Sequence, residues 1–385
     1  MLLLFFTTTT TAQPYKATDH FFLDCGSSTT STTNQRWYFG DEYSKFVPIP
    51  NITTTSFSST PDFHDSSVPN IPYSSARIFN DSSFTYMFPV SEGPKFLRLY
   101  FYPATYSGLN PDQFFFSVSS NGYSLLSNFS AFLTASYMAK IRLDAGVDGP
   151  SVPNFFKEFL INVKDSQCLN VIFTPLPNSY AFINGIEIVS LPENLHAKEP
   201  KGVNMDTVPA INKDTALENV YRLNMGGDKY AVKMIQTPNY TAPEPVYQTQ
   251  RSMGNQSDVY NLTWILPVDS GFYYMLRLHF CSIIPQYTKP RQVVFTIFIN
   301  NQTAEEEADL FDWTQGSGHP VFKDYVVFVT DPDGHRSKQD LWLAMHPNSN
   351  SEEYRDAFLN GLEVFKMSKD NNLALSHNSS QISSP

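Results

Sequence analysis

The side chains that could carry out chemistry form no catalytic pattern in this sequence. None of the eight histidines lies at metal-ligand spacing from another, and G-x-S-x-G, H-E-x-x-H and G-x-x-x-x-G-K-[ST] motifs are missing. We therefore expect no catalytic residue, and no metal, calcium, nucleotide or other cofactor. A glycosidase is the most distant alternative, because two carboxylates that are far apart in sequence can face one sugar bond.

Two short runs of residues could contact a ligand instead. The run Glu305-Glu306-Glu307 is most simply a solvated acidic loop, but its charge can also attract a cationic partner. The aromatic run Trp37-Tyr38-Phe39 can stack on a sugar ring or pack into a core. For this aromatic run we expect core packing.

The elements that must position these residues occur twice. The segment 182–188, F-I-N-G-I-E-I, is echoed by 358–364, F-L-N-G-L-E-V, and 97–101, L-R-L-Y-F, is echoed by 276–280, L-R-L-H-F. The matched segments keep their patterns while the lengths between them change, which is typical of strands joined by loops. The sequence therefore predicts two related globular modules in tandem.

The local patterns predict that both modules are built from β-strands. Alternating or β-branched runs occur at 97–102, 171–174, 294–299, 325–330 and 341–345, with turn residues between them and 27 prolines overall. This pattern predicts an all-β fold of two tandem β-sandwiches with short helical segments.

The sequence also predicts one short helix and one type of turn. The clearest helical segment is Asp214 to Tyr221, with Asp214 as its N-cap. The repeated Asn-Gly pair predicts a two-residue type I′ hairpin turn, in which both residues have positive φ.

The boundaries follow from the repeats and from the composition between them. We place the first module at 20–192, a polar linker at 193–206 and the second module at 207–368, followed by a polar, disordered tail at 369–385. Residues 1–12 resemble a short or truncated signal peptide, and no stretch has the roughly 20 apolar residues of a membrane-spanning helix.

Charge and cysteine content restrict the partners further. The chain has a net charge of −11, which disfavours nucleic acid and offers a polyanion such as pectin no long-range attraction, whereas a basic peptide would be attracted. Three cysteines allow at most one bridge, and Cys25 with Cys168 is one such pair. The alternative is that all three are buried apolar residues, which we favour for Cys281.

Glycosylation sequons are consistent with secretion. Eight N-x-[ST] motifs are spread across both halves of the chain, and each would mark a solvent-facing loop: Asn51, Asn80, Asn128, Asn239, Asn255, Asn261, Asn301 and Asn378.

These residues resemble a known family of ectodomains. In the first module the resemblance lies in 23–26, 95–103, 115–118 and 128–131, and in the second it lies in 216–227, 277–281 and 359–364. Together they resemble the two malectin-like modules of plant receptor-like kinases of the FERONIA, ANXUR and THESEUS group. The resemblance extends over residues 20 to 368, in the expected order.

The resemblance implies a receptor at the plant cell surface that reports wall integrity, growth or fertilisation. Its implied partners are a secreted basic peptide of the RALF type, a glycosylphosphatidylinositol-anchored co-receptor, and pectin or another wall glycan. Relatives continue into a transmembrane helix and a Ser/Thr kinase, whereas this sequence contains no kinase motifs. For the chain as given we therefore expect no enzyme activity.

The sequence departs from the pattern of this family at one position of the sugar-binding site. Related modules commonly place an acidic residue where this sequence has Ser282, so the malectin disaccharide site does not carry over. As ligand-binding candidates we retain Tyr102, Tyr106, Tyr123 and Tyr287 for sugar stacking, together with the acidic run, although buried or surface aromatics are the simpler interpretation. We expect the ligand in or near the cleft between the modules. The main alternative function is a secreted carbohydrate-binding lectin without signalling.

Overall fold

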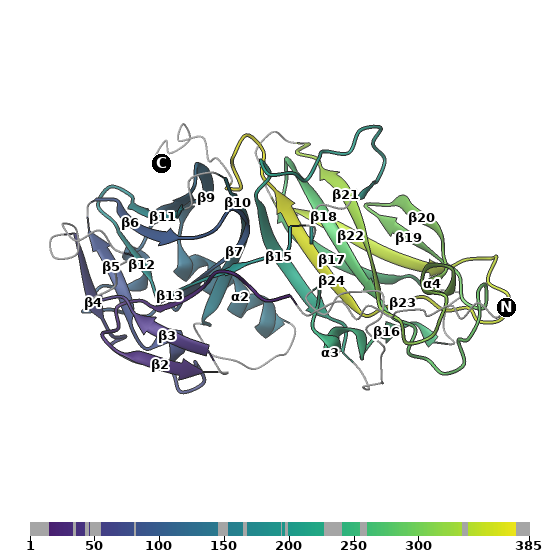
Figure 1. The fold of residues 1–385 in the computed structure, drawn as a ribbon, viewed down its shortest axis with the longest axis horizontal. Coiled ribbons are helices and arrows are strands. Elements are labelled where there is room, and N and C mark those ends of the chain that lie inside the picture. The colour runs from purple at the N-terminus through teal and green to yellow at the C-terminus, as the bar shows by residue number, and fades with distance from the viewer. Residues whose placement is uncertain are drawn as a thin grey trace, which may run out of the picture.

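The computed structural model describes residues 15–33, 36–42, 46, 55–80, 82–144, 153–164, 168–193, 195–196, 199–226, 241–254, 260–332 and 338–374. The predicted signal segment 1–12 and the sequons at Asn51, Asn239, Asn255 and Asn378 lie outside these residues. Two β-sandwiches lie side by side along the long axis of the molecule (Figure 1). This arrangement confirms the predicted all-β class.

We call the first sandwich domain A. Its strands are β1 (His20–Asp24), β2 (Thr30–Thr33), β3 (Arg36–Gly40), β4 (Ser56–Ser59), β5 (Ala76–Asn80), β6 (Phe84–Pro89), β7 (Gly93–Phe101), β8 (Phe116–Ser120), β9 (Tyr123–Phe129), β10 (Phe155–Val163), β11 (Cys168–Pro175), β12 (Tyr180–Ile183) and β13 (Gly185–Ser190). Its helices are α1 (Asn70–Tyr73), the 3-10 turn η2 (Pro111–Gln113) and α2 (Ala131–Asp144).

The second sandwich is domain B. It follows β14 (Lys201–Gly202) and contains β15 (Leu217–Asn224), β16 (Arg251–Ser252), β17 (Leu262–Asp269), β18 (Phe272–Phe280), β19 (Phe295–Ile299), β20 (Gln302–Ala308), β21 (Val321–Val329), β22 (Lys338–Pro347), β23 (Phe358–Leu359) and β24 (Gly361–Met367). Its helices are α3 (Glu244–Tyr247) and α4 (Leu310–Thr314).

One sheet runs through both domains. Its strand order is β14-β21-β18-β24-β15-β10-β7-β13-β1-β3-β2, and the domains meet where β10 pairs antiparallel with β15. This pairing places Leu160 opposite Leu217. The ammonium of Lys157 in domain A also lies 2.8 Å from the carboxylate of Glu218 in domain B. Backbone pairing, apolar contact and an ion pair therefore all connect the two halves.

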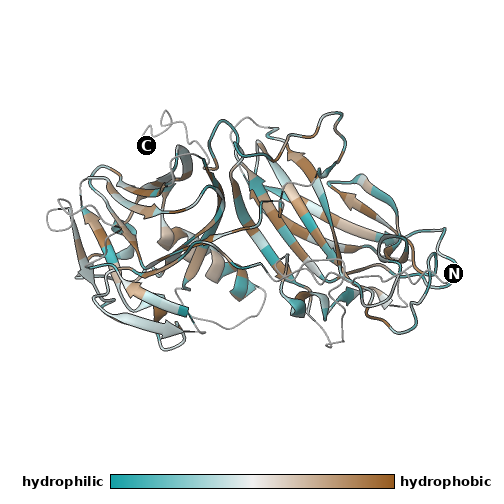
Figure 2. Ribbon diagram, in the orientation of Figure 1, coloured by the Kyte–Doolittle hydropathy of each residue, from teal (hydrophilic) through white to brown (hydrophobic). Residues whose placement is uncertain are grey.

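Smaller sheets complete each sandwich and enclose its core. Domain A adds the sheets β6-β11-β8-β9 and β12-β5-β4, and domain B adds β17-β22-β19-β20 and β16-β23. Along strands of domain B such as β15 and β18, hydrophobic and hydrophilic bands alternate (Figure 2). This alternation is the period of two that turns one face of a strand toward a core.

The repeated Asn-Gly pair is not the type I′ turn that the sequence predicts. Asn184 is fully buried between β12 and β13, at the point where the chain passes from the small sheet to the continuous sheet. Its side chain accepts a hydrogen bond from the Tyr102 backbone N–H (2.7 Å) and donates to the Ser75 carbonyl (2.8 Å). Asn360 does the same in domain B, between β23 and β24.

The glycine after each asparagine is required for close packing. A Cβ on Gly185 would lie 2.5 Å from the ring of Pro72 in α1, and one on Gly361 would lie 2.5 Å from Val246 in α3. Neither glycine has a positive φ. The duplication therefore repeats a tertiary contact rather than a turn. Positive φ at both turn residues occurs at Asn121-Gly122, between β8 and β9.

The helix predictions were wrong in position. Most of 214–221 belongs to the strand β15, because its apolar residues continue the sheet. The longest helix, α2, was not predicted from the sequence, and several of its apolar side chains, including Leu133 and Leu143, are exposed. Among the described residues, no helix is both long enough and apolar enough to cross a membrane.

The start of the predicted disordered tail is ordered, and we call residues 369–374 the C-terminal strap. It begins with a tight turn at 370–371, where both residues have positive φ. The Ser124 N–H of β9 then donates to the Asn371 carbonyl, and the Leu373 N–H donates to the Ser124 carbonyl, both at 2.9 Å. Leu373 is fully buried in the core of domain A. The chain that leaves domain B therefore returns to domain A.

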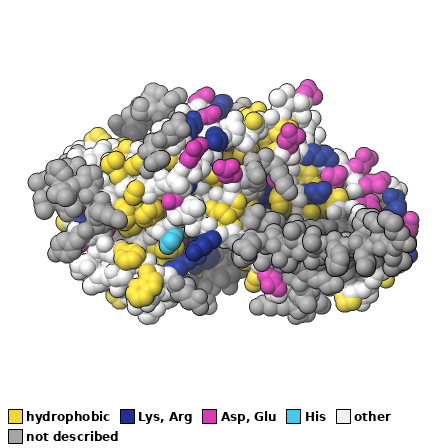
Figure 3. All heavy atoms as spheres, viewed as in Figure 1, with side chains coloured by type: hydrophobic (Ala, Val, Ile, Leu, Met, Phe, Trp, Pro, Cys, Tyr) yellow, Lys and Arg dark blue, Asp and Glu magenta, His cyan; other side chains and the backbone are white. Residues whose placement is uncertain are grey.

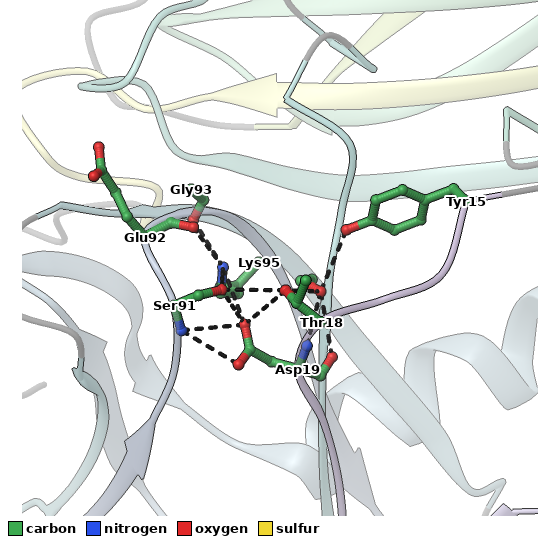
Figure 4. Close-up of polar contacts among 8 residues, drawn as sticks. Tyr15, Thr18, Asp19, Ser91, Glu92, Gly93 and Lys95 are labelled. Carbon is green, nitrogen blue, oxygen red and sulfur yellow. Dashed lines mark hydrogen bonds and ion pairs between the residues drawn. The ribbon is translucent and has the colours of Figure 1, made fainter. Parts of the chain in front are cut away.

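The N-terminal segment is tied to domain A by polar contacts (Figure 4). The Ser91 hydroxyl donates to the Asp19 carboxylate at 2.5 Å, and the buried ammonium of Lys95 lies 3.5 Å from the same carboxylate. Thr18 and Tyr15 donate to the hydroxyl of a serine in β13. These contacts hold the chain before β1 against the start of β7.

The cysteines do not form the bridge that the sequence allows. Cys25 is fully buried after β1, beside Asp41, whereas Cys168 starts β11 opposite Pro89 in a different sheet. The structure contains no disulfide between them. Cys281 is fully buried after β18, which confirms the interpretation that it is an apolar residue.

Candidate functional site

The candidate site is a cleft between the two domains. A cavity of about 420 Å³ lies there, within the size range of ligand pockets. We call it the interdomain pocket. Its walls come from β3, β7 and β13 of domain A, from β15, β18, β24, α3 and residues 241–243 of domain B, and from Leu191, Leu195 and His196 between them.

Charged side chains cross the sheet beneath this pocket in a line of alternating sign. Arg98 on β7 donates through Nη1 to Glu187 (3.0 Å) and through Nη2 to Glu158 (3.2 Å). Glu187 also accepts hydrogen bonds from Arg36 and from the Tyr38 hydroxyl. Arg98 lies directly opposite both Glu158 and Glu187 on the neighbouring strands, so the sheet register itself creates these two ion pairs.

Arg222 continues this line from domain A into domain B. Its Nη1 lies 2.8 Å and 2.9 Å from the two carboxylate oxygens of Glu158, and its Nε donates to Glu363 at 2.8 Å. Glu363 in turn lies 3.2 Å from Nε2 of His279. We call the complete line the charged row: Arg36, Glu187, Arg98, Glu158, Arg222, Glu363 and His279.

The charged row is repeated in the duplication, with one substitution that joins the domains. Arg277 pairs with Asp324 in domain B (2.8 Å) as Arg98 pairs with Glu158 in domain A. In domain A, Phe22 occupies the ladder position that Arg222 occupies in domain B. The guanidinium that reaches across the boundary is therefore specific to the second repeat.

The electrostatics of the site favour binding over catalysis. Burial alone would raise the pKa of Glu363, but His279 and Arg222 hold that pKa well below its ordinary value. Burial, with the charge of Arg277 nearby, lowers the pKa of His196 to about 3, so this histidine is neutral. Glu363 is thus ionised, and all three carboxylates in the row are engaged by arginine. Within the described part of the chain, no group of histidine, cysteine or acidic residues is arranged to hold a metal ion.

The four tyrosines retained for sugar stacking do not line this pocket. Tyr102, Tyr106, Tyr123 and Tyr287 are all buried, with Tyr106 fully enclosed. Tyr106 donates to the Tyr102 carbonyl, and Tyr287 donates to Asp356. Because their ring faces are packed inside the domains, they offer no surface for a sugar. This corrects the sequence-based selection.

The acidic run lies on an edge strand. Glu305, Glu306 and Glu307 belong to β20 rather than to a loop, because their register continues the sheet with β19. Glu305 is 3.2 Å from Lys201, and Glu307 is 3.5 Å from Arg291. Figure 3 shows acidic side chains interspersed with basic ones over the right-hand half, which contains domain B. The run is therefore partly neutralised.

The aromatic run differs from its prediction. Tyr38 is buried, but Trp37 is 62% exposed and Phe39 is 54% exposed, because they point to the opposite face of β3. The described sequons also differ among themselves. Asn128, Asn261 and Asn301 are exposed, whereas Asn80 ends β5 with its side-chain oxygen buried.

Sequence reasoning missed the charged row, although a signal was present. Each matched pair of segments carries a charged residue inside an apolar strand, such as Arg98 with Arg277 and Glu187 with Glu363. A charge that recurs at the same place in two buried strands must have a partner. The repeated charges could therefore have been assigned to one another.

With this geometry, the class of protein can be stated from comparison with known proteins. The chain belongs to the Malectin-like domain family, whose model matches residues 23–239 and 229–367. It is similar to the receptor-like protein kinase FERONIA of Arabidopsis thaliana, with 42% identity over 97% of this chain and 45% of FERONIA. ANXUR1 of the same plant is 33% identical over 91% of this chain and 44% of ANXUR1. The chain thus spans less than half the length of these kinases.

Solved structures show which part of these receptor kinases the chain matches. The crystal structure of the plant receptor-like kinase FER has a TM-score of 0.78 and 41% identity, covering 92% of this chain and 98% of that one. The ANX1 ectodomain of Arabidopsis thaliana has a TM-score of 0.80 and 32% identity, covering 92% and 98%. The chain therefore corresponds to the ectodomain of these receptors.

Proposed function

We propose that this chain is the ligand-recognition part of a plant cell-surface receptor-like protein, located outside the cell. It binds a basic RALF-type peptide together with a glycosylphosphatidylinositol-anchored co-receptor, and reports wall integrity, growth or fertilisation. One observation carries the proposal. A structure of the peptide RALF23 in complex with FER and LLG2 matches 94% of this chain, with a TM-score of 0.79 and 41% identity.

The distribution of charge favours β20 and its surroundings for a basic peptide. The interdomain pocket offers a basic peptide no unpaired carboxylate, because each glutamate of the charged row is engaged by an arginine. By contrast, Glu306 is exposed and has no side-chain partner among the described residues. β20 is also an edge strand, whose free backbone groups can pair with an extended peptide.

Calorimetric titration of the glycosylated chain with a basic RALF-type peptide, with and without the co-receptor, tests this proposal. Saturable binding that weakens at high salt is expected, because salt screens exposed charges. Glu306→Gln should weaken binding about two- to fivefold at low salt. Asp112→Asn, which removes an equally exposed charge from domain A, is the matched control. Absence of binding with the co-receptor present would exclude the peptide-receptor function.

A lectin is the second proposed function, and the exposed pair Trp37 and Phe39 favours it. Aromatic rings that point outward from one strand can stack on sugar rings. Titration with pectin fragments should then give binding that persists at high salt and is lost in Trp37→Ala. Unchanged pectin binding by this variant would rule out the pair as the sugar site.

A further inference from the structure

We propose that the interdomain pocket binds a small carboxylic acid with an apolar body, through the free edges of Arg36 and Arg222. The ligand belongs to a different class from the basic peptide above, and this inference does not rest on that proposal. It follows from the composition of the pocket walls, from the hydrogen-bonding capacity left open beneath them, and from the local charge.

The walls are largely apolar and come from both domains. Phe96, Val189 and Leu191 contribute from the side of domain A and the linker, and Val246 and Phe365 contribute from domain B. Burial of a ligand ring or alkyl group here would gain about 25 cal/mol per Å² of apolar surface. A sugar or an inorganic anion would leave this surface unmatched.

The charged side chains at the pocket leave only donors open. Arg36 donates a hydrogen bond to Glu187 through Nη1 alone, and its side chain is 50% exposed. Arg222 donates through Nε to Glu363 and through Nη1 to Glu158, and its side chain is 42% exposed. The Nε of Arg98 is buried and has no hydrogen-bond partner among the described residues. Arg36 and Arg222 thus retain N–H groups that an acceptor on a ligand can use, whereas the Arg98 Nε is closed to a ligand.

The carboxylates that line the pocket are already occupied. Glu187 accepts hydrogen bonds from Arg36, Arg98 and the Tyr38 hydroxyl. Glu363 accepts one from Arg222 and lies beside His279. A cationic ligand would find no free carboxylate, whereas an anionic one meets guanidinium N–H groups that remain open on Arg36 and Arg222. A carboxylate is suited to this arrangement because two parallel N–H groups of a guanidinium match its two oxygens.

Four small probes, titrated into the full chain by calorimetry, test the ligand class. Phenylacetate carries both features, acetate lacks the ring, phenylethylamine reverses the charge, and digalacturonate places carboxylates on a polar body. We expect saturable binding of phenylacetate, at least tenfold weaker binding of acetate and no binding of phenylethylamine. Tighter binding of digalacturonate or phenylethylamine than of phenylacetate, or no phenylacetate binding at millimolar concentration, would overturn the proposal.

Substitution tests the assignment to this pocket. Arg36→Gln should weaken phenylacetate binding about tenfold, since one charge-assisted contact is lost. Its half-exposed side chain makes the substitution compatible with folding, which an unchanged melting curve verifies. Arg355→Gln removes the same charge from an exposed site outside the pocket lining and should leave affinity unchanged. Equal affinity of the Arg36→Gln variant and the parent chain would place the bound acid elsewhere and refute the proposal.

Discussion

At the scale of single residues, Asp24 is a buried carboxyl group that has no cationic partner among the described residues. It is 2% exposed, and it accepts a hydrogen bond from the Ser75 hydroxyl at 3.3 Å. The nearby Arg77 is engaged by Asp41 instead. Burial, reinforced by the charge of Asp41 and only partly opposed by the bond from Ser75, raises the pKa of Asp24 to about 7. The folded protein therefore keeps this proton in mildly acidic solution.

The raised pKa of Asp24 makes the stability of the fold depend on pH. Between the unfolded value of 3.8 and about 7, the folded state holds a proton that the unfolded state has lost, so stability falls as pH rises through this window. Asp24→Asn mimics the protonated form. The variant should lose this dependence and gain at most about 4 kcal/mol at pH 8, since one pKa unit is about 1.4 kcal/mol.

Urea unfolding at pH 5 and pH 8 measures this effect. Asn224 occupies the equivalent ladder position in domain B, opposite Gly361 as Asp24 is opposite Gly185, but it is exposed. Asn224→Asp should therefore change stability little at either pH. Equal stabilisation of the Asp24→Asn variant at both pH values would show that Asp24 is already ionised at pH 5.

Asn184 carries a second prediction at the residue scale. Asn184→Ala would leave the buried Tyr102 N–H and the Ser75 carbonyl without their partner. The loss should amount to roughly 2–5 kcal/mol in the free energy of unfolding, because each unsatisfied buried group costs about 1–3 kcal/mol. Asn70→Ala, at an exposed asparagine in α1, is the control. Two variants of equal stability would show that Asn184 acts only as a linker between strands.

At the scale of elements, the C-terminal strap converts a polar tail into part of the core of domain A. Leu373 is fully buried there, so Leu373→Ala should cost about 2–5 kcal/mol. Leu143→Ala removes the same side chain from a 76% exposed position on α2 and should cost almost nothing. Thermal unfolding of both variants distinguishes the outcomes. A melting temperature unaffected by Leu373→Ala would show that the strap is detached in solution.

The strands were predictable from sequence where their side chains alternate, as in β7 and β22, because the period of two directly reports one buried face. Two features could not be predicted locally. The Asn-Gly pair has the composition of a turn, but its backbone is fixed by contacts with Ser75 and Tyr102 far along the chain. Leu373 is a single apolar residue within a polar tail, and only the tertiary structure provides its partner.

At the scale of the whole molecule, one continuous sheet joins the two domains, so they are not independent units connected only by a linker. The domain organisation was predictable because duplication leaves a repeated pattern in the sequence. The contact between the domains was not predictable, since Arg222 and Glu158 lie in strands whose pairing depends on how the two domains meet. Both repeats and the linker contribute residues to the pocket lining, so neither repeat alone predicts the pocket.

The continuous sheet predicts how the molecule unfolds. Leu160 and Leu217 face each other across the joint within an apolar cluster that includes Met275 and Phe365. Because these contacts and the strap couple the domains, calorimetric heating should give one cooperative transition. Leu160→Asp places a charge in this cluster and should separate the transition into two, one for each domain. Leu133→Asp, at a 58% exposed position on α2, should retain a single transition. Two transitions in the parent chain would mean that the domains unfold independently, despite the strand pairing between β10 and β15.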